Sequence, residues 1–342
     1  MSSNFKTLLA FLGLFFGYAV QAQDTIVLLN EDRVIGDFKG MSRGVATIET
    51  AYSDADFTIE WSGVGYVITN KVFLIRYEGS DYDAGKIRMN PSDPSQIMIT
   101  YEDGAGEVTV PLQSIVELSD VDGGWIDRMS ANISVGASLT RANNLRQFTA
   151  SGLVGYIDEN FSLNATVNSI YSTQDDASDT RRTDASLTGQ VFITRGWFGA
   201  ASVNYLSDGE INLVSRLNNR AGLGKNWYQT NTWYFSSTVG VANNQEEFSG
   251  EDAASINSWE AFVTLELNLF DTGDLSLFSN FTAFPSLTEA GRFRYDAKLD
   301  VKYDLPYDFF VKLGTTLNYD NQPSGGAVPL SYIFQTTFGW EL

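Results

Sequence analysis

The sequence predicts an all-β protein in two parts: an N-terminal domain of short strands, then an antiparallel transmembrane β-barrel of about 12 strands. Three observations lead to this prediction. After residue 124, apolar and polar side chains alternate over segments of about ten residues, longer than most strands of soluble proteins. Tight turns and longer polar loops alternate between these segments. Before residue 124, the strand-like segments are short and irregularly spaced, so we expect domains at 23–124 and 125–342.

The first segment of the chain resembles an export signal. Lys6 precedes the apolar run Leu8–Val20, and Val20-Gln21-Ala22 has the form of a cleavage site that ends in a small residue, before Gln23. This order is typical of a secretory signal peptide, which we predict at residues 1–22. The run is shorter than the roughly 20 apolar residues of a membrane-spanning helix, although a retained anchor helix is the alternative. No Cys follows the run, so we expect no lipoprotein anchor, and no other segment could span a bilayer as a helix.

The N-terminal domain contains the same three blocks of sequence twice, in the same order and at a nearly constant offset. The blocks are 35–38, 46–50 and 57–64 in the first copy, and 84–87, 97–100 and 108–115 in the second. Each copy is too small to bury its apolar face alone. The pattern therefore predicts either two copies packed together or two small barrels in tandem. Chance similarity between β-rich segments is the alternative explanation.

The barrel strands are predicted from their alternation. Segment 129–140 places Met, Ala, Ile, Val and Leu at odd positions and Ser, Asn, Gly and Thr at even positions. The same alternation marks 161–168, 197–205, 293–303, 309–319 and 330–342. Aromatic residues gather at the segment ends, as expected at a membrane interface: Tyr156, Phe161, Trp197, Tyr205, Trp233, Tyr303 and Trp340. A soluble sandwich also alternates, but its strands usually stop after about five or six residues.

The connections predict the orientation of the barrel. Tight turns are expected at 158–160, 194–196, 271–274 and 305–308, and longer loops at 174–179, 243–255 and 321–327. Barrels of the bacterial outer membrane have short periplasmic turns and longer external loops. An even number of strands then leaves both barrel ends, and the N-terminal domain, in the periplasm. We therefore expect the cell outer membrane of a Gram-negative-type bacterium.

Composition excludes several classes of function. The 342 residues include 42 acidic and 22 basic side chains, a formal net charge of −20, which argues against nucleic acid and against charge-driven docking on anionic membranes. The chain has no His and no Cys, which excludes Ser-His-Asp and Cys-His catalysis and zinc sites built on those residues. We predict no enzyme, no cofactor, and no catalytic, cofactor-binding or metal-binding residue, although a carboxylate pair remains chemically open.

Two acidic loop clusters have the oxygen ligands that Ca²⁺ requires. They are Asp175-Asp176 with Asp179, and Glu246-Glu247 with Glu251-Asp252. Neither cluster has a defined ligand spacing, so we expect solvated loop charges, with the bridging of lipopolysaccharide by divalent ions as the alternative.

The polar face of the barrel is the candidate site. Its predicted lumen-facing residues are Arg182, Asp184, Arg216, Arg220, Glu260, Glu266, Arg294, Asp296, Lys298, Asp300, Lys302 and Lys312. The two signs nearly balance, so the interior can be filled by its own charge-assisted hydrogen bonds. The alternative is a narrow path for ions or solutes. Barrels of about sixteen strands leave an open channel, so for fewer strands we expect a narrow or closed lumen.

Two stretches carry a family resemblance. One is 29–36 together with 48–52 and 57–61, and the other is the chain end Phe338-Gly339-Trp340-Glu341-Leu342. Together they resemble an uncharacterised bacterial family labelled salt-induced outer-membrane proteins. The resemblance implies an outer-membrane β-barrel with no established activity. Phe338, Trp340 and Leu342 would form its barrel-assembly signal, although such barrels commonly end in an aromatic residue rather than Leu.

Three functions from different classes follow as hypotheses. The first is a barrel for envelope maintenance or stress response, whose periplasmic domain binds a periplasmic or envelope partner. The second is a narrow outer-membrane channel for ions or small solutes. The third is an enzyme that acts on lipid or glycan through carboxylates. In each case the expected partners include outer-membrane lipid, lipopolysaccharide and the barrel-assembly machinery.

Overall fold

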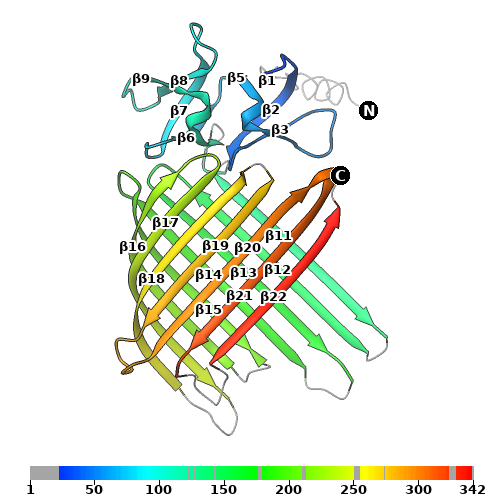
Figure 1. Ribbon diagram of the computed structural model, residues 1–342, viewed down its shortest axis with the longest axis vertical. Helices are drawn as coiled ribbons and strands as arrows, with labels where there is room; N and C mark the ends of the chain where they lie inside the picture. Colours follow the sequence, from blue (N-terminus) through cyan, green and yellow to red (C-terminus); the bar gives the residue numbers. More distant parts are fainter. Residues whose placement is uncertain are drawn as a thin grey trace, which may run out of the picture.

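The computed structural model describes residues 23–121, 124–126, 128–141, 144–175, 179–209, 213–249, 255–272, 274–322 and 329–340. The predicted signal peptide, residues 1–22, lies outside these ranges. The chain forms a ten-stranded N-terminal sheet and a twelve-stranded C-terminal sheet (Figure 1), so the all-β prediction is confirmed. Among the residues described, no helix has the length and apolar character needed to cross a membrane.

The N-terminal domain repeats one order of elements. The first copy contains β1 (Asp24–Leu28), β2 (Arg33–Ser42), β3 (Val45–Glu49), β4 (Phe57–Glu60), the 3-10 helix η1 (Trp61–Gly63) and β5 (Val64–Ile68). The second contains β6 (Val72–Tyr77), β7 (Asp83–Met89), β8 (Gln96–Tyr101), β9 (Glu107–Pro111), η2 (Leu112–Ser114) and β10 (Ile115–Asp120). Strand β1 pairs with β2 and β5 as β6 pairs with β7 and β10. This topology supports the predicted duplication.

The two copies share one hydrophobic core, so the alternative of two small barrels in tandem is wrong. Phe38, Ile48 and Trp61 from the first copy are buried with Ile87, Ile99 and Leu112 from the second. Strand β10 pairs with β2 and joins the copies into one sheet. Gly40 makes this close approach feasible: its φ is 141°, and any side chain there would collide with the Leu118 carbonyl.

The C-terminal sheet contains twelve strands in chain order, each antiparallel to the next. They are β11 (Met129–Thr140), β12 (Leu145–Ile157), β13 (Phe161–Thr173), β14 (Thr180–Phe192), β15 (Trp197–Asp208), β16 (Leu213–Gln229), β17 (Trp233–Phe248), β18 (Ser255–Thr272), β19 (Leu275–Pro285), β20 (Phe293–Leu305), β21 (Phe309–Asp320) and β22 (Leu330–Trp340). The 3-10 helix η4 (Pro306–Asp308) joins β20 to β21. The predicted number and order of strands are confirmed.

One predicted loop is wrong in part. The sequence predicted a loop over 243–255, but β17 continues to Phe248 and pairs with the start of β18, with Glu246 opposite Ile256. The run Asn243-Asn244-Gln245-Glu246 is polar on both faces, which imitates a loop. Its side chains on one face are buried among other polar groups, since Asn244 is 1% and Glu246 5% exposed. Their hydrogen bonds stabilise the strand.

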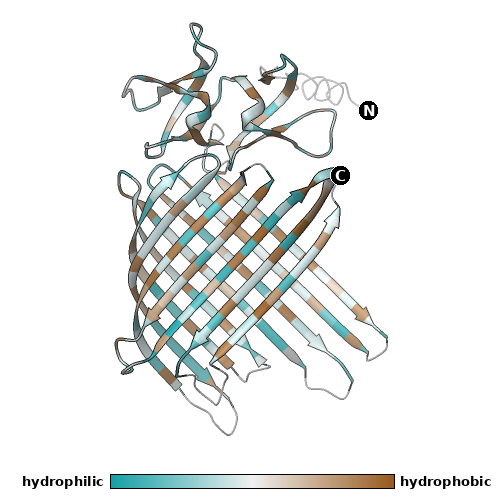
Figure 2. Ribbon diagram, viewed as in Figure 1, coloured by the Kyte–Doolittle hydropathy of each residue, from teal (hydrophilic) through white to brown (hydrophobic). Residues whose placement is uncertain are grey.

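The sheet curls, and its last strands, yellow to red, lie in front of its first strands, teal and green (Figure 1). Alternation gives it two distinct faces, visible as alternating colours along each strand (Figure 2). On the outer face, apolar side chains such as Leu223 and Val239 are exposed. The inner face carries the polar residues, and its residues near the loop end of β16–β20 are buried, with Glu260 0% exposed.

Strands β11 and β22 are the two edges of this sheet. Within the described residues, neither pairs with the other, so the ladder that closes a barrel is not formed between them. The twelve-stranded antiparallel sheet is therefore established, and its closure into a barrel stays a prediction.

The N-terminal domain lies on the tight-turn end of the sheet (Figure 1). Its second copy makes most of the contact: Leu74 and Tyr82 form an apolar cluster with Ile157 and Phe192. The rings of Tyr82 and Phe192 are 5.0 Å apart. The Asp81 carboxylate accepts hydrogen bonds from the Thr194 hydroxyl and the Arg195 backbone N–H, at 3.1 and 3.2 Å. These contacts hold the domain against the tight-turn end of the curled sheet.

Candidate functional site

The inner face of the sheet carries all twelve predicted lumen-facing residues. The register brings alternate residues of neighbouring strands to one face, as in the row Arg220–Ala242–Glu260 across β16, β17 and β18. Continuing across β19 to β21, the same face holds Arg294 opposite Phe284, and Lys302 opposite Lys312. This shared face follows from the two-residue period of a strand. Whether it lines a lumen depends on closure of the sheet.

A buried ion pair lies on this face near the loop end of β18 and β20. The Glu260 carboxylate accepts two hydrogen bonds from the Arg294 guanidinium, from Nε at 2.9 Å and from Nη2 at 2.7 Å. The guanidinium groups of Arg220 and Arg294 each lie 4.9 Å from the centre of the Phe284 ring. Such bidentate and cation–π contacts hold buried charges in fixed positions.

The pair extends toward the loop end of the sheet through further polar contacts. Arg216 donates from Nε to Glu246 Oε1 at 2.7 Å, and Asn244 donates to the same oxygen at 2.8 Å. Arg220 donates to Asn218 Oδ1 at 2.5 Å. Asp296 lies within electrostatic range of Arg216, Arg220 and Arg294. We call the set Arg216, Arg220, Glu246, Glu260, Phe284, Arg294 and Asp296 the central network.

The sequence identified five members of the central network and missed two. Glu246 was assigned to a loop, and Phe284 was missed because an apolar ring interrupts the polar face. Both could be found by continuing the alternation of their strands, since Glu246 and Phe284 occupy even positions like Glu260 and Arg294.

The remaining predicted residues form separate pairs. Arg182 Nη1 lies 2.9 Å from Asp208, and Asp184 accepts a hydrogen bond from Asn168 at 2.8 Å. Glu266 accepts one from Asn280 at 3.2 Å. The Lys298 ammonium lies 3.2 Å from Asp300, with both side chains about half exposed. These pairs lie outside the central network.

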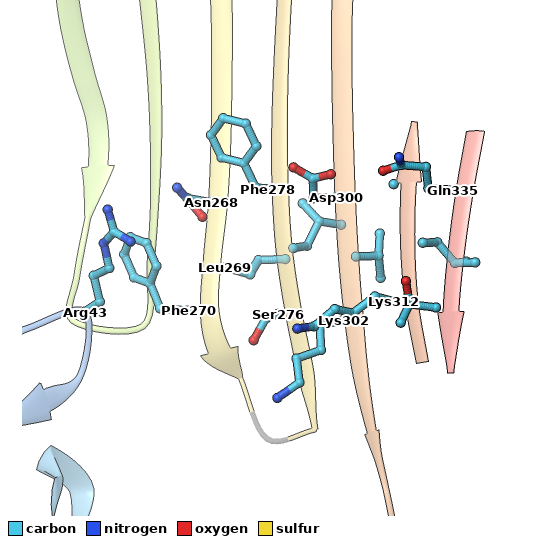
Figure 3. Close-up of a pocket in the computed structure, with 15 residues that line it drawn as sticks. Arg43, Asn268, Leu269, Phe270, Ser276, Phe278, Asp300, Lys302, Lys312 and Gln335 are labelled. Atoms are coloured by element: carbon cyan, nitrogen blue, oxygen red, sulfur yellow. The ribbon is translucent and has the colours of Figure 1, made fainter. Parts of the chain in front are cut away.

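A second feature is a pocket of about 500 Å³ on the inner face near the N-terminal domain (Figure 3). Its charged lining residues are Asp300, Lys302 and Lys312 from the sheet and Arg43 from the N-terminal domain. Arg43 lies over the Phe270 ring at 5.6 Å, and both lysines lie over Phe310, at 5.3 and 4.7 Å. We call this cavity the junction pocket.

The acidic loop clusters are partly described. Asp175 accepts a hydrogen bond from Asn144 at 2.6 Å, and Asp179 accepts one from the Tyr171 hydroxyl at 2.7 Å. Asp176, Glu251 and Asp252 lie outside the described ranges. Within those ranges, no group of three or more acidic, His or Cys side chains is placed to hold a metal ion.

The predicted assembly signal ends β22. Phe338 and Trp340 are exposed on the outer face, and the Trp340 indole donates to the Tyr307 carbonyl at 3.1 Å. Leu342 lies outside the described residues.

Comparison with known proteins gives a family without a known activity. A family model with the description "Protein of unknown function, DUF481" matches residues 133–341, which include nearly the whole twelve-stranded sheet and the central network. No curated protein matches the chain. Residues 133–341 are more than half of the chain, and the protein therefore belongs to the DUF481 family of proteins of unknown function.

Proposed function

We propose that this protein is an outer-membrane β-barrel whose N-terminal domain lies in the periplasm and binds a protein partner, in the service of envelope maintenance or a stress response. The proposal assigns no catalysis and no cofactor. The barrel would anchor the domain in the membrane, in contact with lipid and lipopolysaccharide, after insertion by the barrel-assembly machinery.

The two faces of the sheet support the membrane assignment. Apolar side chains on the outer face have no covering layer of protein in the described structure and suit the hydrocarbon region. Stacked aromatic pairs lie near the tight turns, including Tyr156 with Phe161 and Tyr228 with Trp233. Such rings suit the boundary between lipid and water.

The central network supports an interior filled by the protein's own side chains. Glu260 and Phe284 are almost completely buried, and their arginine partners cross the inner face between strands. A wide aqueous pore would leave these groups hydrated. This favours an anchoring role over bulk transport.

The two copies of the N-terminal domain have equivalent faces, one packed against the sheet and one exposed, and this difference is the observation that supports partner binding. In the second copy, Leu74 lies opposite Ala84 on β7 and Ser119 on β10, and this face packs against the sheet below. In the first copy, Thr25 lies opposite Ile35 and Ile68 in the same arrangement. Ile35 and Ile68 are 47% and 52% exposed. Exposed apolar surface of this kind is typical of an interaction site.

The test of partner binding is complementation. Cells that lack the protein should admit more of a hydrophobic fluorescent dye than wild-type cells, and the full chain should restore the barrier. A chain with Ile35→Asp and Ile68→Asp should fail to restore it while the sheet still shows heat-modifiable gel mobility. Tyr52→Asp, at a residue 70% exposed elsewhere in the domain, is the matched control. Full restoration by the double variant would refute partner binding through this face.

The test of location uses the absence of Cys from the chain. A single Thr288→Cys, in the β19–β20 loop, should react with a membrane-impermeant maleimide on intact cells. A single Ser53→Cys, in the N-terminal domain, should react only after the outer membrane is permeabilised. Labelling of Ser53→Cys on intact cells would contradict a periplasmic domain.

A narrow channel is the second candidate, favoured by the row of alternating charges on the inner face of β20. Its inner-face residues Arg294, Asp296, Lys298, Asp300 and Lys302 follow one another along the strand. A conducting path would give steady single-channel currents in planar bilayers, with altered ion selectivity in Lys298→Gln. Silence from well-folded protein would exclude this candidate.

A further inference from the structure

The junction pocket contains an unfavourable pairing of like charges. Lys302 on β20 and Lys312 on β21 are direct cross-strand partners, so both side chains leave the same face of the sheet at neighbouring positions. Like charges opposite one another in an antiparallel pair destabilise it. A sheet that keeps such a pair on its inner face gains stability when an anion binds between the two ammonium groups.

Carboxylates within the protein compensate this charge only in part. Lys302 lies 3.0 Å from Asp304, and Asp300 in the pocket wall is paired with Lys298. Across the described ranges, Lys312 and Arg43 form no ion pair; the Lys312 ammonium lies over the Phe310 ring and the Arg43 guanidinium over the Phe270 ring. Glu266 is within electrostatic range of Arg43, but its carboxylate accepts a hydrogen bond from Asn280 instead. The pocket is therefore basic in a chain of net charge −20.

The position of Arg43 is an independent sign that its side chain is used. Arg43 and Gly44 form the two-residue turn between β2 and β3, with φ values of 54° and 76°. Turns with two positive φ angles favour Asn, Asp or Gly at the first position. Arg has no conformational advantage there, and its side chain reaches from the N-terminal domain to the pocket in the sheet (Figure 3).

We propose that the junction pocket binds a phosphate group carried by a small polar molecule or a lipid headgroup. The Arg43 guanidinium offers paired donors that match phosphate oxygens, and the two lysines supply point charges. Because Lys302 is paired with Asp304, the charge left for a ligand comes mainly from Lys312 and Arg43, and it suits the negative charge of a phosphate group. Ser276, Gln335 and Thr337 also line the pocket and supply hydrogen-bonding groups for the rest of the molecule.

This assignment goes beyond the proposed function, because it concerns a different surface from the exposed face of Ile35 and Ile68. A volume of about 500 Å³ accommodates a phosphorylated small molecule or a headgroup. Since Arg43 belongs to the N-terminal domain and the lysines belong to the sheet, the bound phosphate would also fasten the two parts together.

The test is calorimetric titration of the full mature chain, refolded in a non-ionic detergent without phosphate. Inorganic phosphate and glycerol 3-phosphate represent free ligands, and dihexanoylphosphatidylglycerol represents a lipid headgroup. Lys312→Gln and Arg43→Asn should each weaken binding about tenfold or more. Asn suits the turn better than Arg, so the second variant removes the charge without endangering the fold. Lys312→Arg should retain binding.

Lys225→Gln is the matched control. The Lys225 ammonium also lies 4.7 Å from an aromatic ring, that of Trp227, but on the outer face of the sheet. Its loss should leave the affinity unchanged. Tighter binding of glycerol 3-phosphate would identify a free ligand, and tighter binding of the lipid would identify a headgroup. The proposal is overturned if no probe binds at up to about 10 mM, or if Lys312→Gln and Arg43→Asn bind as the wild type does.

Discussion

The indole Nε1 of Trp61 donates a hydrogen bond to the carbonyl oxygen of Leu112 at 3.0 Å. The two residues begin equivalent 3-10 helices in the two copies of the N-terminal domain. Gln113 returns a hydrogen bond from its side chain to the Trp61 carbonyl at 3.1 Å. The copies are therefore joined by a reciprocal polar contact inside their shared core.

Replacement of Trp61 should reveal how strongly the copies depend on each other. Trp61→Phe removes the donor to Leu112 and leaves a cavity in the core, at a cost of about 2–4 kcal/mol. Hydrogen exchange of residues 23–121 in the full chain, measured by mass spectrometry, should then quicken in both copies. Trp125→Phe, at an indole that is 66% exposed, is the control and should leave exchange unchanged. Faster exchange confined to the first copy would argue against a shared folding unit.

Loss of one partner from the central network should destabilise the sheet. Glu260→Gln leaves Arg294 buried without its carboxylate, and breaking a buried pair in this way typically costs about 3–5 kcal/mol. The urea midpoint of the refolded protein, followed by heat-modifiable gel mobility, is the measurement. Asp300→Asn breaks a half-exposed pair and should cost about 1 kcal/mol or less. Equal effects of the two substitutions would contradict the burial of the network.

The stability of the N-terminal domain should depend on pH through Lys71. Its ammonium binds Asp37 and lies 2.5 Å from Asp120. Burial alone would raise the pKa of Asp37, but hydrogen bonds from Lys39 and Lys71 outweigh it and lower the pKa below the ordinary value of 3.8. Burial would likewise lower the pKa of Lys71, whereas its hydrogen bonds to Asp120 and Asp37 raise it above the ordinary 10.5.

The directions of these two pKa shifts predict a loss of stability in two ranges of pH. The contribution of Asp37 is complete above pH 3.8 and is lost as pH falls through its lowered pKa. The contribution of Lys71 is complete below pH 10.5 and is lost as pH rises toward its raised pKa. The thermal stability of the domain, followed in the full chain by near-ultraviolet circular dichroism, should fall in both ranges of pH. Lys71→Met should remove the alkaline edge and reduce the acid edge, where Lys39 still binds Asp37. Lys86→Met, at an exposed lysine of the second copy, should leave both edges in place.

Strands β11 and β22 should pair when the protein enters a membrane. Unpaired backbone groups at two sheet edges cost several kcal/mol each in hydrocarbon. Pairing must join residues that share a face, and the inner face holds even positions of β11 but odd positions of β22. Ser134→Cys should therefore form a disulfide with Gln335→Cys or a register neighbour, Ile333→Cys or Thr337→Cys.

The control for this crosslink is a pair of residues that lie on opposite faces of the sheet. Ser134→Cys with Phe334→Cys or Thr336→Cys places the two thiols on different faces and should give no bond. Because the chain has no native Cys, every disulfide on a non-reducing gel reports the introduced pair. Crosslinks at both parities, or at neither in folded protein, would show that these edges do not form one regular ladder.

Local pattern was sufficient for most of the fold. Alternation predicted about twelve strands for the C-terminal region and the shared face of residues as separated as Arg182 and Lys312, because one face of these strands is mostly polar. It failed at Asn243–Glu246, where both faces are polar and only burial against other strands distinguishes strand from loop. The equivalence of Trp61 and Leu112 was also visible in the repeated blocks, but not their packing into one core.

The junction pocket could not be predicted in the same way. Arg43 lines the same pocket as Lys302 and Lys312 only because the N-terminal domain lies on the tight-turn end of the sheet, and no local pattern encodes such a juxtaposition of residues so distant in sequence. The sequence signal that remained was an arginine before Gly44 at a two-residue hairpin turn, where Asn or Asp would be ordinary.

The short ladder between β2 and β10 also determines how the N-terminal domain would respond to force. In the described chain it consists of Glu117, Leu118 and Ser119 opposite Ser42, Met41 and Gly40. The second copy packs on the sheet through Leu74 and Tyr82, and the first copy touches it through Arg43 over Phe270. Tension applied to the first copy would therefore load this short ladder, the Trp61–Leu112 hydrogen bond and the Arg43 contact together. Under load, the two copies would separate along the β2–β10 ladder, and the second copy would keep its contacts with the sheet.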